Sequence, residues 1–571
     1  MEKTNRFDEK LERKRRIIRV AHQEEKADIV IKNAHYLDVF ANEFSDADIA
    51  IAEGLIVGIG SYRGMKEIDA TGKVLIPGLI DAHIHLESSL VLPDEFARAV
   101  LPHGTTCVIT DPHEIANVLG TKGIDYMLEA TSNLPIDVHF MLPSCVPATP
   151  HDESGAILDV AALDTYYHHP KVLGLAEMMD YVGILKGDPQ VVGKIVQSQI
   201  HHKKIDGHAP DLSGDDLNAY VAAGVYSDHE CFTIENAIEK LKRGQFIMIR
   251  EGTAAQNLDA LMGLLIPQYY SRCMFATDDK HPHELLEHGH IDSMVKRAIK
   301  AGVDPIIALK VATHHAARYF LLNNKGAIAP GYLADLVIID SIENFHVETV
   351  LKKGKNVFDG VVLPFVKSEV SPILHTQATH SIHIAPLSQN SFMVKEAPII
   401  GMEKGQIVTT NRGRAHSINL TQDILKIAMI ERHHATGHIG VGFIQGYGLS
   451  TGAIATSIAH DAHNIIVVGT NDEDIKTAVE RIDMIHGGMV IVEKGVVKGE
   501  LSLPIAGLIS DQPLEVVNNQ LKHLHTIARQ MGVNESIDPF MSLSFMSLTV
   551  IPELRITTHG IFDVHTQTCH H

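Results

Sequence analysis

The stretch Pro77-Gly-Leu-Ile-Asp-Ala-His-Ile-His85 points to a fold class, because an apolar run ends there in two histidines separated by one residue. On a β-strand the side chains alternate between the two faces, so His83 and His85 lie on the same face. Both imidazoles can therefore reach one metal ion. The alternative is a strand that merely presents two polar residues where it ends.

Short apolar runs alternate with helical stretches, such as residues 215–223 and 233–241, over the part of the chain that follows. Eight such units over about 250 residues fit an α/β fold of the (β/α)8, TIM-like barrel type, although a doubly wound open sheet would alternate in the same way. The expected strands are residues 74–85, 104–111, 136–143, 172–177, 204–208, 225–229, 245–250 and 273–278.

Four more of these runs end in a residue that can bind a metal: Glu177, His208, His229 and Asp278. In a barrel, the carboxyl ends of all strands open on one face, where catalytic groups gather. One isolated histidine or aspartate at a strand end is more often a capping group. Their joint occurrence with the histidine pair favours a common metal site.

β-Rich runs also flank this region on both sides, which suggests one small domain assembled from both flanks. We expect an N-terminal helix, a composite β-sandwich domain, the barrel and a C-terminal α/β domain. Their residues are 1–25, then 26–73 with 325–365, then 74–324, and finally 366–571.

Composition excludes several classes. The chain has 571 residues, a net charge of −21 and 45% hydrophobic residues, which excludes disordered and fibrous proteins and argues against nucleic-acid or anionic-membrane partners. Its five cysteines form no C-x-x-C pair, so neither a disulfide framework nor a cysteine zinc site is expected. No long apolar run or signal peptide is apparent, and a cytoplasmic protein is expected, commonly a symmetric homodimer.

The order of these strand-end residues resembles the amidohydrolase superfamily, and longer segments resemble the adenine deaminases within it. The resemblance covers nearly the whole chain. Two departures are Ala176-Glu-Met-Met-Asp180, where the family commonly has Gly-Glu-Met-Met-Asn, and Thr313-His-His-Ala-Ala317, where it has Thr-x-Asn-Ala-Ala. The matching segments include His85-Leu-Glu-Ser-Ser89, Asp111-Pro-His-Glu-Ile-Ala-Asn117, Ile205-Asp-Gly-His-Ala-Pro210, Ser227-Asp-His-Glu-Cys231, Thr277-Asp-Asp-Lys-His-Pro282 and Ala459-His-Asp-Ala-His-Asn-Ile465.

The resemblance implies a site for two divalent metal ions that deaminates adenine to hypoxanthine and ammonia in purine salvage. It also implies that residues 366–571 are a C-terminal domain of the adenine deaminase type. Manganese or iron is favoured by the resemblance, and Zn²⁺ also suits imidazole and carboxylate ligands. The implied ligands are His83 and His85 on one ion, His208 and His229 around the other, Glu177 as the bridge and Asp278 completing the site.

The chemistry expected of this site is hydrolysis. The metals make hydroxide available at neutral pH for attack on C6 of the purine. Asp278 is placed to accept the water proton and to pass it to the departing amine, with Glu177 as the other catalytic carboxylate.

Groups that hold the purine ring are expected just beyond the strand ends. Their alternative role is hydrogen bonding and ion pairing within the loops. His103 and His113, beside the second strand, are expected to be structural rather than catalytic. The candidate ring-binding residues are Ser88, Ser89, Arg250, Glu251 and Asp279.

Two other functions fit parts of the pattern. The same metal site serves enzymes acting on a different aminopurine, an aminoheterocycle or a cyclic amide, and release of ammonia from adenine discriminates between these substrates. A histidine-rich protein that only sequesters metal is the non-enzymatic alternative. It needs no convergence of ligands from five strands, and it predicts that His229→Ala weakens metal binding only in proportion to the histidine lost.

Overall fold

A basic helix begins the chain and packs against the first sheet. The computed structural model describes residues 2–253, 255–388, 390–403 and 408–570. The helix is α1 (Glu2–Ala21), and its Val20 is fully buried against the sheet. Arg16 on the same helix binds the carboxylates of Asp28 and Glu53. Both apolar packing and ion pairs thus hold the helix against the sheet.

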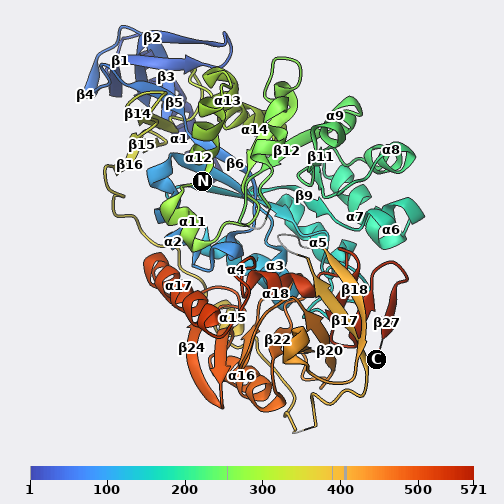
Figure 1. Cartoon of the computed structure of the whole chain (residues 1–571). Helices are drawn as coiled ribbons and strands as arrows, with labels where there is room; N and C mark the ends of the chain where they lie inside the picture. Colours follow the sequence, from blue (N-terminus) through green and yellow to red (C-terminus); the bar gives the residue numbers. More distant parts are fainter. Residues whose placement is uncertain (1, 254, 389, 404–407, 571) are drawn as a thin grey trace.

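Two segments that are far apart in the chain build the first sheet, at the upper left of Figure 1. The strand order is β16-β15-β14-β5-β1-β2-β3, with β4 beside β1. Strand β14 pairs antiparallel with β5, so the two β-rich flanks lie in one sheet. The strands are β1 (Ala27–Asp38), β2 (Glu43–Ala52), β3 (Leu55–Gly60), β4 (Gly64–Asp69), β5 (Val74–Pro77), β14 (Leu336–Ile339), β15 (Val347–Lys352) and β16 (Lys355–Asp359).

The single strand expected over residues 74–85 is divided at Gly78. Strand β5 belongs to the first sheet, whereas β6 (Leu79–Ile84) starts the central parallel strands. The amide of Gly78 donates to the carbonyl of Asp335 at 2.9 Å, and a Cβ here would lie only 2.2 Å from Oγ1 of Thr106. The prediction of one strand is therefore wrong. The apolar run continues through Gly78, so the sequence gives no sign that the chain passes there from one sheet to the next.

The central region contains parallel strands whose order follows the chain. Five of them pair in the order β10-β9-β8-β7-β6 and three in the order β11-β12-β13. A parallel bridge between Ile84 and Asp278 joins β6 to the chain after β13. A doubly wound sheet would instead reverse its order at a switch point. The remaining strands are β7 (Thr105–Thr110), β8 (Asp137–Leu142), β9 (Val172–Met178), β10 (Lys204–Gly207), β11 (Ser227–Asp228), β12 (Phe246–Arg250) and β13 (Cys273–Ala276).

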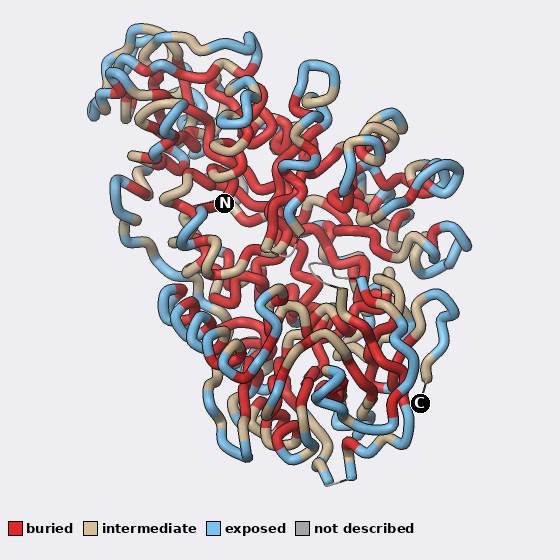
Figure 2. Tube along the Cα trace, in the orientation of Figure 1, coloured by how far each residue is buried: buried red, intermediate tan, exposed pale blue. Residues whose placement is uncertain are grey.

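Helices surround these strands, and Figure 2 shows the buried chain running through the middle of the molecule. Local capping sets where several helices begin. The side chain of Thr233 accepts the amide of Asn236 at 3.2 Å, and Asp188 caps the helix that starts at Pro189. The helices are α2 (Pro93–Val100), α3 (His113–Leu119), α4 (Thr121–Ala130), α5 (Val160–Asp164), α6 (Tyr181–Lys186), α7 (Pro189–Ile200), α8 (Gly214–Ala223), α9 (Ile234–Lys242), α10 (Leu258–Leu261), α11 (Pro282–Glu287), α12 (Ile291–Lys300), α13 (Pro305–Val311) and α14 (His314–Tyr319).

The C-terminal region forms a second large sheet and a small one, in orange and red at the bottom of Figure 1. The large sheet has the order β18-β17-β20-β19-β22-β21-β23-β24, and the small one β25-β26-β27. The strands are β17 (Ala397–Met402), β18 (Thr409–Ala415), β19 (Ile424–Ile430), β20 (Ile439–Gln445), β21 (Ala453–Thr456), β22 (Ile465–Gly469), β23 (Gly488–Glu493), β24 (Val496–Ser502), β25 (Leu554–Thr557), β26 (Gly560–Asp563) and β27 (Thr568–His570). The helices are α15 (Pro372–Thr379), α16 (Asp472–Met484), α17 (Leu514–Gln530) and α18 (Met541–Ser544).

Among the described residues, none of the helices has both the length and the apolar character that crossing a membrane requires.

A buried ion cluster ties the first sheet to the central strands. Asp137, at the start of β8, and Asp335 both bind Lys325 and Lys352. Burial raises the pKa of Asp137, but the charges of the two lysines outweigh it, so the pKa lies far below its ordinary value. The pKa of Asp335 is also lowered, for the same reasons. Both aspartates are therefore ionised, and the interface depends on their charges.

Replacing Asp137 tests this interface. Asp137→Asn leaves two buried lysines with one carboxylate, and we expect the free energy of unfolding to fall by about 3 kcal/mol. A carboxylate with a lowered pKa stabilises the fold above its unfolded value of about 3.9 and loses this contribution as the pH falls. The gap between wild type and variant in urea midpoint should therefore narrow between pH 7 and pH 3. Asp46→Asn, at a side chain that is 84% exposed, is the control and should change the midpoint little.

Candidate metal centre

The histidine pair at the end of β6 starts the site. His83 and His85 are both buried, and their Nε2 atoms lie 3.2 Å apart. Strand alternation turns both rings to the same side, as the sequence predicts. Nδ1 of His85 lies 3.0 Å from the carbonyl oxygen of Asp111, which fixes the ring and leaves Nε2 directed into the site.

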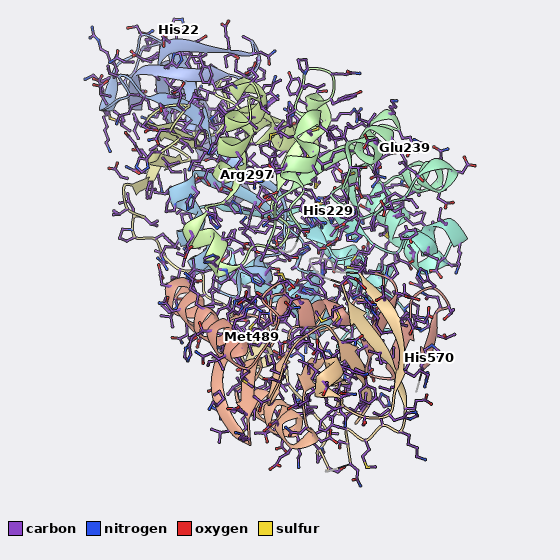
Figure 3. The ribbon with its side chains drawn as sticks, in the orientation of Figure 1. His22, His229, Glu239, Arg297, Met489 and His570 are labelled. Carbon is purple, nitrogen blue, oxygen red and sulfur yellow. The ribbon has the colours of Figure 1, made fainter. Side chains whose placement is uncertain are left out.

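Glu177 near the end of β9 stands between this pair and a second one. Its Oε1 lies 3.2 Å from Nε2 of His85 and 3.9 Å from Nε2 of His83. Its Oε2 lies 2.8 Å from Nδ1 of His208 and 3.2 Å from Nε2 of His229. Each carboxylate oxygen thus faces one histidine pair. Figure 3 shows His229 near the middle of the molecule.

Asp278 follows β13 and also reaches the first histidine pair. Its Oδ1 lies 3.4 Å from Nε2 of His83 and 3.1 Å from Nε2 of His85. The residue has φ of 66°, in the left-handed region that non-glycine residues rarely adopt. Its amide donates to the carbonyl of His83, and its carbonyl accepts from the amide of His85. These two hydrogen bonds hold the unusual conformation and fix Asp278 to the histidine strand.

The donor atoms have the spacing that a metal ion requires. A tetrahedral shell with bonds of about 2.1 Å places neighbouring donors about 3.4 Å apart. The contacts among His83, His85 and Asp278 are 3.1–3.4 Å, and Nδ1 of His208 lies 3.2 Å from Nε2 of His229. Imidazole and carboxylate donors without a thiolate suit first-row divalent ions. The residues therefore fit a divalent metal site.

The charge state of the carboxylates agrees with this reading. Burial raises the pKa of Glu177, but hydrogen bonds from His113, His208 and His229 outweigh it, so the pKa lies well below its ordinary value. Burial likewise raises the pKa of Asp278, and the Arg250 guanidinium and the histidines lower it further than burial raises it. Both groups are therefore ionised at neutral pH.

Arg250 and Glu251 lie side by side at the end of β12 but point to different partners. Nη1 of Arg250 donates to Oδ2 of Asp278 at 2.6 Å and also binds Glu230. Glu251 instead binds Arg297, and its Oε2 accepts the amide of Leu258 at 3.0 Å. Arg250 therefore faces the ligand Asp278, whereas the Glu251 carboxylate holds a loop and a helix.

Ser88 and Asp279 contact each other, whereas the hydroxyl of Ser89 has a different partner. Oγ of Ser88 donates to Oδ1 of Asp279 at 2.5 Å, and both residues line a small cavity beside the metal ligands. Oγ of Ser89 donates to the carbonyl of Leu86 at 2.6 Å, within its own turn. The structure thus brings Ser88 and Asp279 to the cavity and directs the Ser89 hydroxyl to the backbone.

The C-terminal region closes this cavity, a contribution that sequence reasoning missed. The region of the central parallel strands supplies Glu87, Ser88, Leu90, Glu114, Asp279 and His281, and the C-terminal region supplies Thr456, Ile458, His460, Met489, Phe540, Met541 and Ser544. The segment from Ala459 to Ile465, one of three C-terminal segments that resemble the family, gave a signal but did not indicate a contact. Nδ1 of His460 lies 3.5 Å from Oε1 of Glu114, across the boundary between the two regions.

His113 connects the two regions at the metal ligands themselves, whereas His103 lies elsewhere. Nδ1 of His113 lies 3.0 Å from Oδ2 of Asp111 and 3.4 Å from Oε1 of Glu177. Its Nε2 faces Oδ1 of Asp461 at 3.9 Å. His103 binds Asp292 at 3.1 Å. His113 was expected from the sequence to be structural, and it lies at the border of the site.

Comparisons with known proteins agree with one another. Residues 74–357 match the model of the amidohydrolase family, and residues 401–568 match that of the adenine deaminase C-terminal domain. The chain is similar to adenine deaminase 2 of Carboxydothermus hydrogenoformans, at 45% identity over 96% of this chain and 98% of that protein. It is 44% identical to the adenine deaminase of Bacillus licheniformis, over 96% and 97% of the two chains. Among solved structures, an enamidase matches with a TM-score of 0.45 and 19% identity, over 60% of this chain and 97% of that chain.

Glu177→Ala tests whether one carboxylate serves both histidine pairs. Because each oxygen faces one pair, we expect loading with Mn²⁺ followed by dialysis to leave less than half of the wild-type metal content. Elemental analysis measures it directly. His103→Ala, whose ring pairs with Asp292, is the control and should keep the wild-type content. Equal metal content in wild type and Glu177→Ala would rule out the bridging role.

Proposed function

Because this chain belongs to the adenine deaminase family of amidohydrolases, we propose that the buried cluster around Glu177 is the site where adenine is hydrolysed. The protein is a hydrolase acting on a C–N bond: adenine and water give hypoxanthine and ammonia. We assign the reaction to purine salvage. The observation that carries the site assignment is the convergence of six side chains from the ends of five strands at metal-ligand distances.

We assign the ligands to two divalent ions. His83, His85, Asp278 and Glu177 would hold one, and His208, His229 and Glu177 would hold the other. Mn²⁺ or Fe²⁺ is favoured, and Zn²⁺ also suits this donor set. Such ions supply Lewis acidity that lowers the pKa of water and makes hydroxide available at neutral pH.

The carboxylate of Asp278 moves the protons in this proposal. It is ionised, since Arg250 and the histidines lower its pKa, and it can accept a proton from the attacking water. It then returns the proton to the exocyclic amine of adenine, which leaves as ammonia. A positioned acid/base group contributes about 10²–10⁴ in rate. Arg250 holds Oδ2 by its hydrogen bond and so fixes the carboxylate with Oδ1 beside the histidine pair.

The purine ring lies in the cavity between the two regions. Ser88 and Asp279 present polar atoms to its nitrogens, while Met489 and Phe540 offer apolar surface to its face. The C-terminal region thereby excludes water from the reacting carbon. Ser89 and Glu251 shape the wall through their backbone and ion-pair contacts rather than by touching the ring.

The arrangement of the strands explains why the ligands converge. We propose that β6 to β13 form one (β/α)8 barrel, which the bridge between Ile84 and Asp278 closes. The carboxyl ends of all strands then open on one face. The first sheet, from residues 26–73 and 325–365 together with β5, forms a separate small domain after the N-terminal helix of residues 1–25. The barrel of residues 74–324 therefore starts at the break at Gly78, and residues 366–571 cover its active-site face.

Incubating the metal-loaded protein with adenine tests the activity. We expect release of one ammonia and one hypoxanthine per adenine consumed, measured by a coupled ammonia assay and by chromatography. Other aminopurines and a cyclic amide such as dihydrouracil provide the comparison and should turn over more slowly. Turnover of the cyclic amide without any release of ammonia from adenine would refute the assignment.

The neighbouring serines give a matched test of the ring-binding assignment. Ser88→Ala removes a hydroxyl that faces the cavity, and we expect kcat/KM for adenine to fall about tenfold, which corresponds to one hydrogen bond of about 1.4 kcal/mol. Ser89→Ala removes a hydroxyl bonded to the backbone and should leave kcat/KM within about twofold. Metal content should stay unchanged in both. Equal losses in the two variants would contradict this placement of the substrate.

A further inference from the structure

A second group of metal-ligand side chains lies at the surface, away from the cluster around Glu177. It consists of Glu153, His438 and His559, whose donor atoms all lie within 4.8 Å of one another. Glu153 lies in the loop after β8, His438 immediately precedes β20, and His559 stands in the turn between β25 and β26. Three segments far apart in the chain therefore meet at one point.

In this group the carboxylate of Glu153 lies between the imidazoles of His438 and His559. Nδ1 of His438 lies 2.9 Å and 3.1 Å from the two carboxylate oxygens of Glu153. Nε2 of His559 lies 3.8 Å from Oε2 of the same residue, and the two ring centroids are 4.8 Å apart. Oγ1 of Thr558 donates to Oε2 at 2.7 Å and holds the carboxylate in place.

We propose that Glu153, His438 and His559 form a binding site for a divalent cation outside the active site. Two imidazoles and one carboxylate favour Zn²⁺, Co²⁺, Ni²⁺ or Cu²⁺ over Mg²⁺ and Ca²⁺, which prefer oxygen donors. Both histidine side chains are nearly half exposed, so the ion enters from solvent. The adjoining open cavity, of about 310 Å³, leaves room for water to complete the coordination shell.

The position of the site indicates a structural role. The backbone carbonyl of Glu153 accepts the side-chain amide of Asn464 at 2.8 Å. Asn464 lies three residues after Asp461, which faces His113 at the metal centre. A cation bound to Glu153 and the two histidines thus ties the loop after β8 to the same C-terminal segment that closes the active-site cavity. The site binds an ion across the boundary of the two regions and takes no part in the chemistry.

Metal titration of the holoenzyme tests this proposal. Protein preloaded with Mn²⁺ is titrated with Zn²⁺, passed through a desalting column and analysed for both metals. We expect wild type to bind one more zinc per chain than the double variant H438A/H559A. Zinc should also raise the thermal midpoint of wild type, and Mg²⁺ at the same concentration should not. H22A/H523A, which removes two exposed histidines elsewhere, is the matched control and should behave as wild type.

Glu153→Gln separates metal binding from folding, because the amide keeps the size of the side chain and can still accept the Thr558 hydrogen bond. We expect this variant to fold and to bind zinc at least tenfold more weakly. Cu²⁺ bound to wild type should show two imidazole nitrogens by pulsed electron paramagnetic resonance. Equal zinc content in wild type and H438A/H559A, or unchanged affinity in Glu153→Gln, would overturn the proposal.

Discussion

The carboxylate of Glu177, buried between two histidine pairs, is the interaction on which the rest of the structure depends. Removing an ionised carboxylate from water costs several kcal/mol unless nearby charges and hydrogen bonds replace the water. Here each oxygen has its own pair of imidazoles, supplied by the ends of separate strands. The strands must therefore end at the same level and on the same side. A parallel order that follows the chain meets this requirement, since it carries every carboxyl end to one face.

The site is completed by regions that are distant in sequence. Asp278 reaches the first histidine pair only because its left-handed backbone is held by hydrogen bonds on both sides of Ile84. His113 then extends the network from Glu177 to Asp461 in the C-terminal region. The C-terminal region is thus part of the site, and its His460 and Phe540 form a wall that the strands alone do not provide.

Local periodicity explains which features the sequence predicts and which it misses. Alternation along a strand places His83 and His85 on one face, and short apolar runs locate the strands, so the convergence of these side chains could be predicted. The break at Gly78 could not, because nothing in the apolar run changes where the chain moves between sheets. Ser88 and Ser89 are equivalent in the sequence, and only the turn they occupy decides which hydroxyl meets the cavity. Contacts between residues more than 300 positions apart, such as Glu114 with His460, leave no periodic signal.

The two histidine clusters differ in burial, and therefore in how their carboxylates are solvated. His83 and His229 are about 1% exposed, so positive charge must reach Glu177 from the protein or from bound ions, because water cannot solvate it. Around Glu153 the histidine side chains are 48% and 46% exposed, and water can take the place of an ion at little cost. An ion at the inner cluster would therefore contribute to the charge balance of the fold. At the outer cluster, occupancy would follow the concentration of free cation, because binding there replaces hydration and the contact between His438 and Glu153.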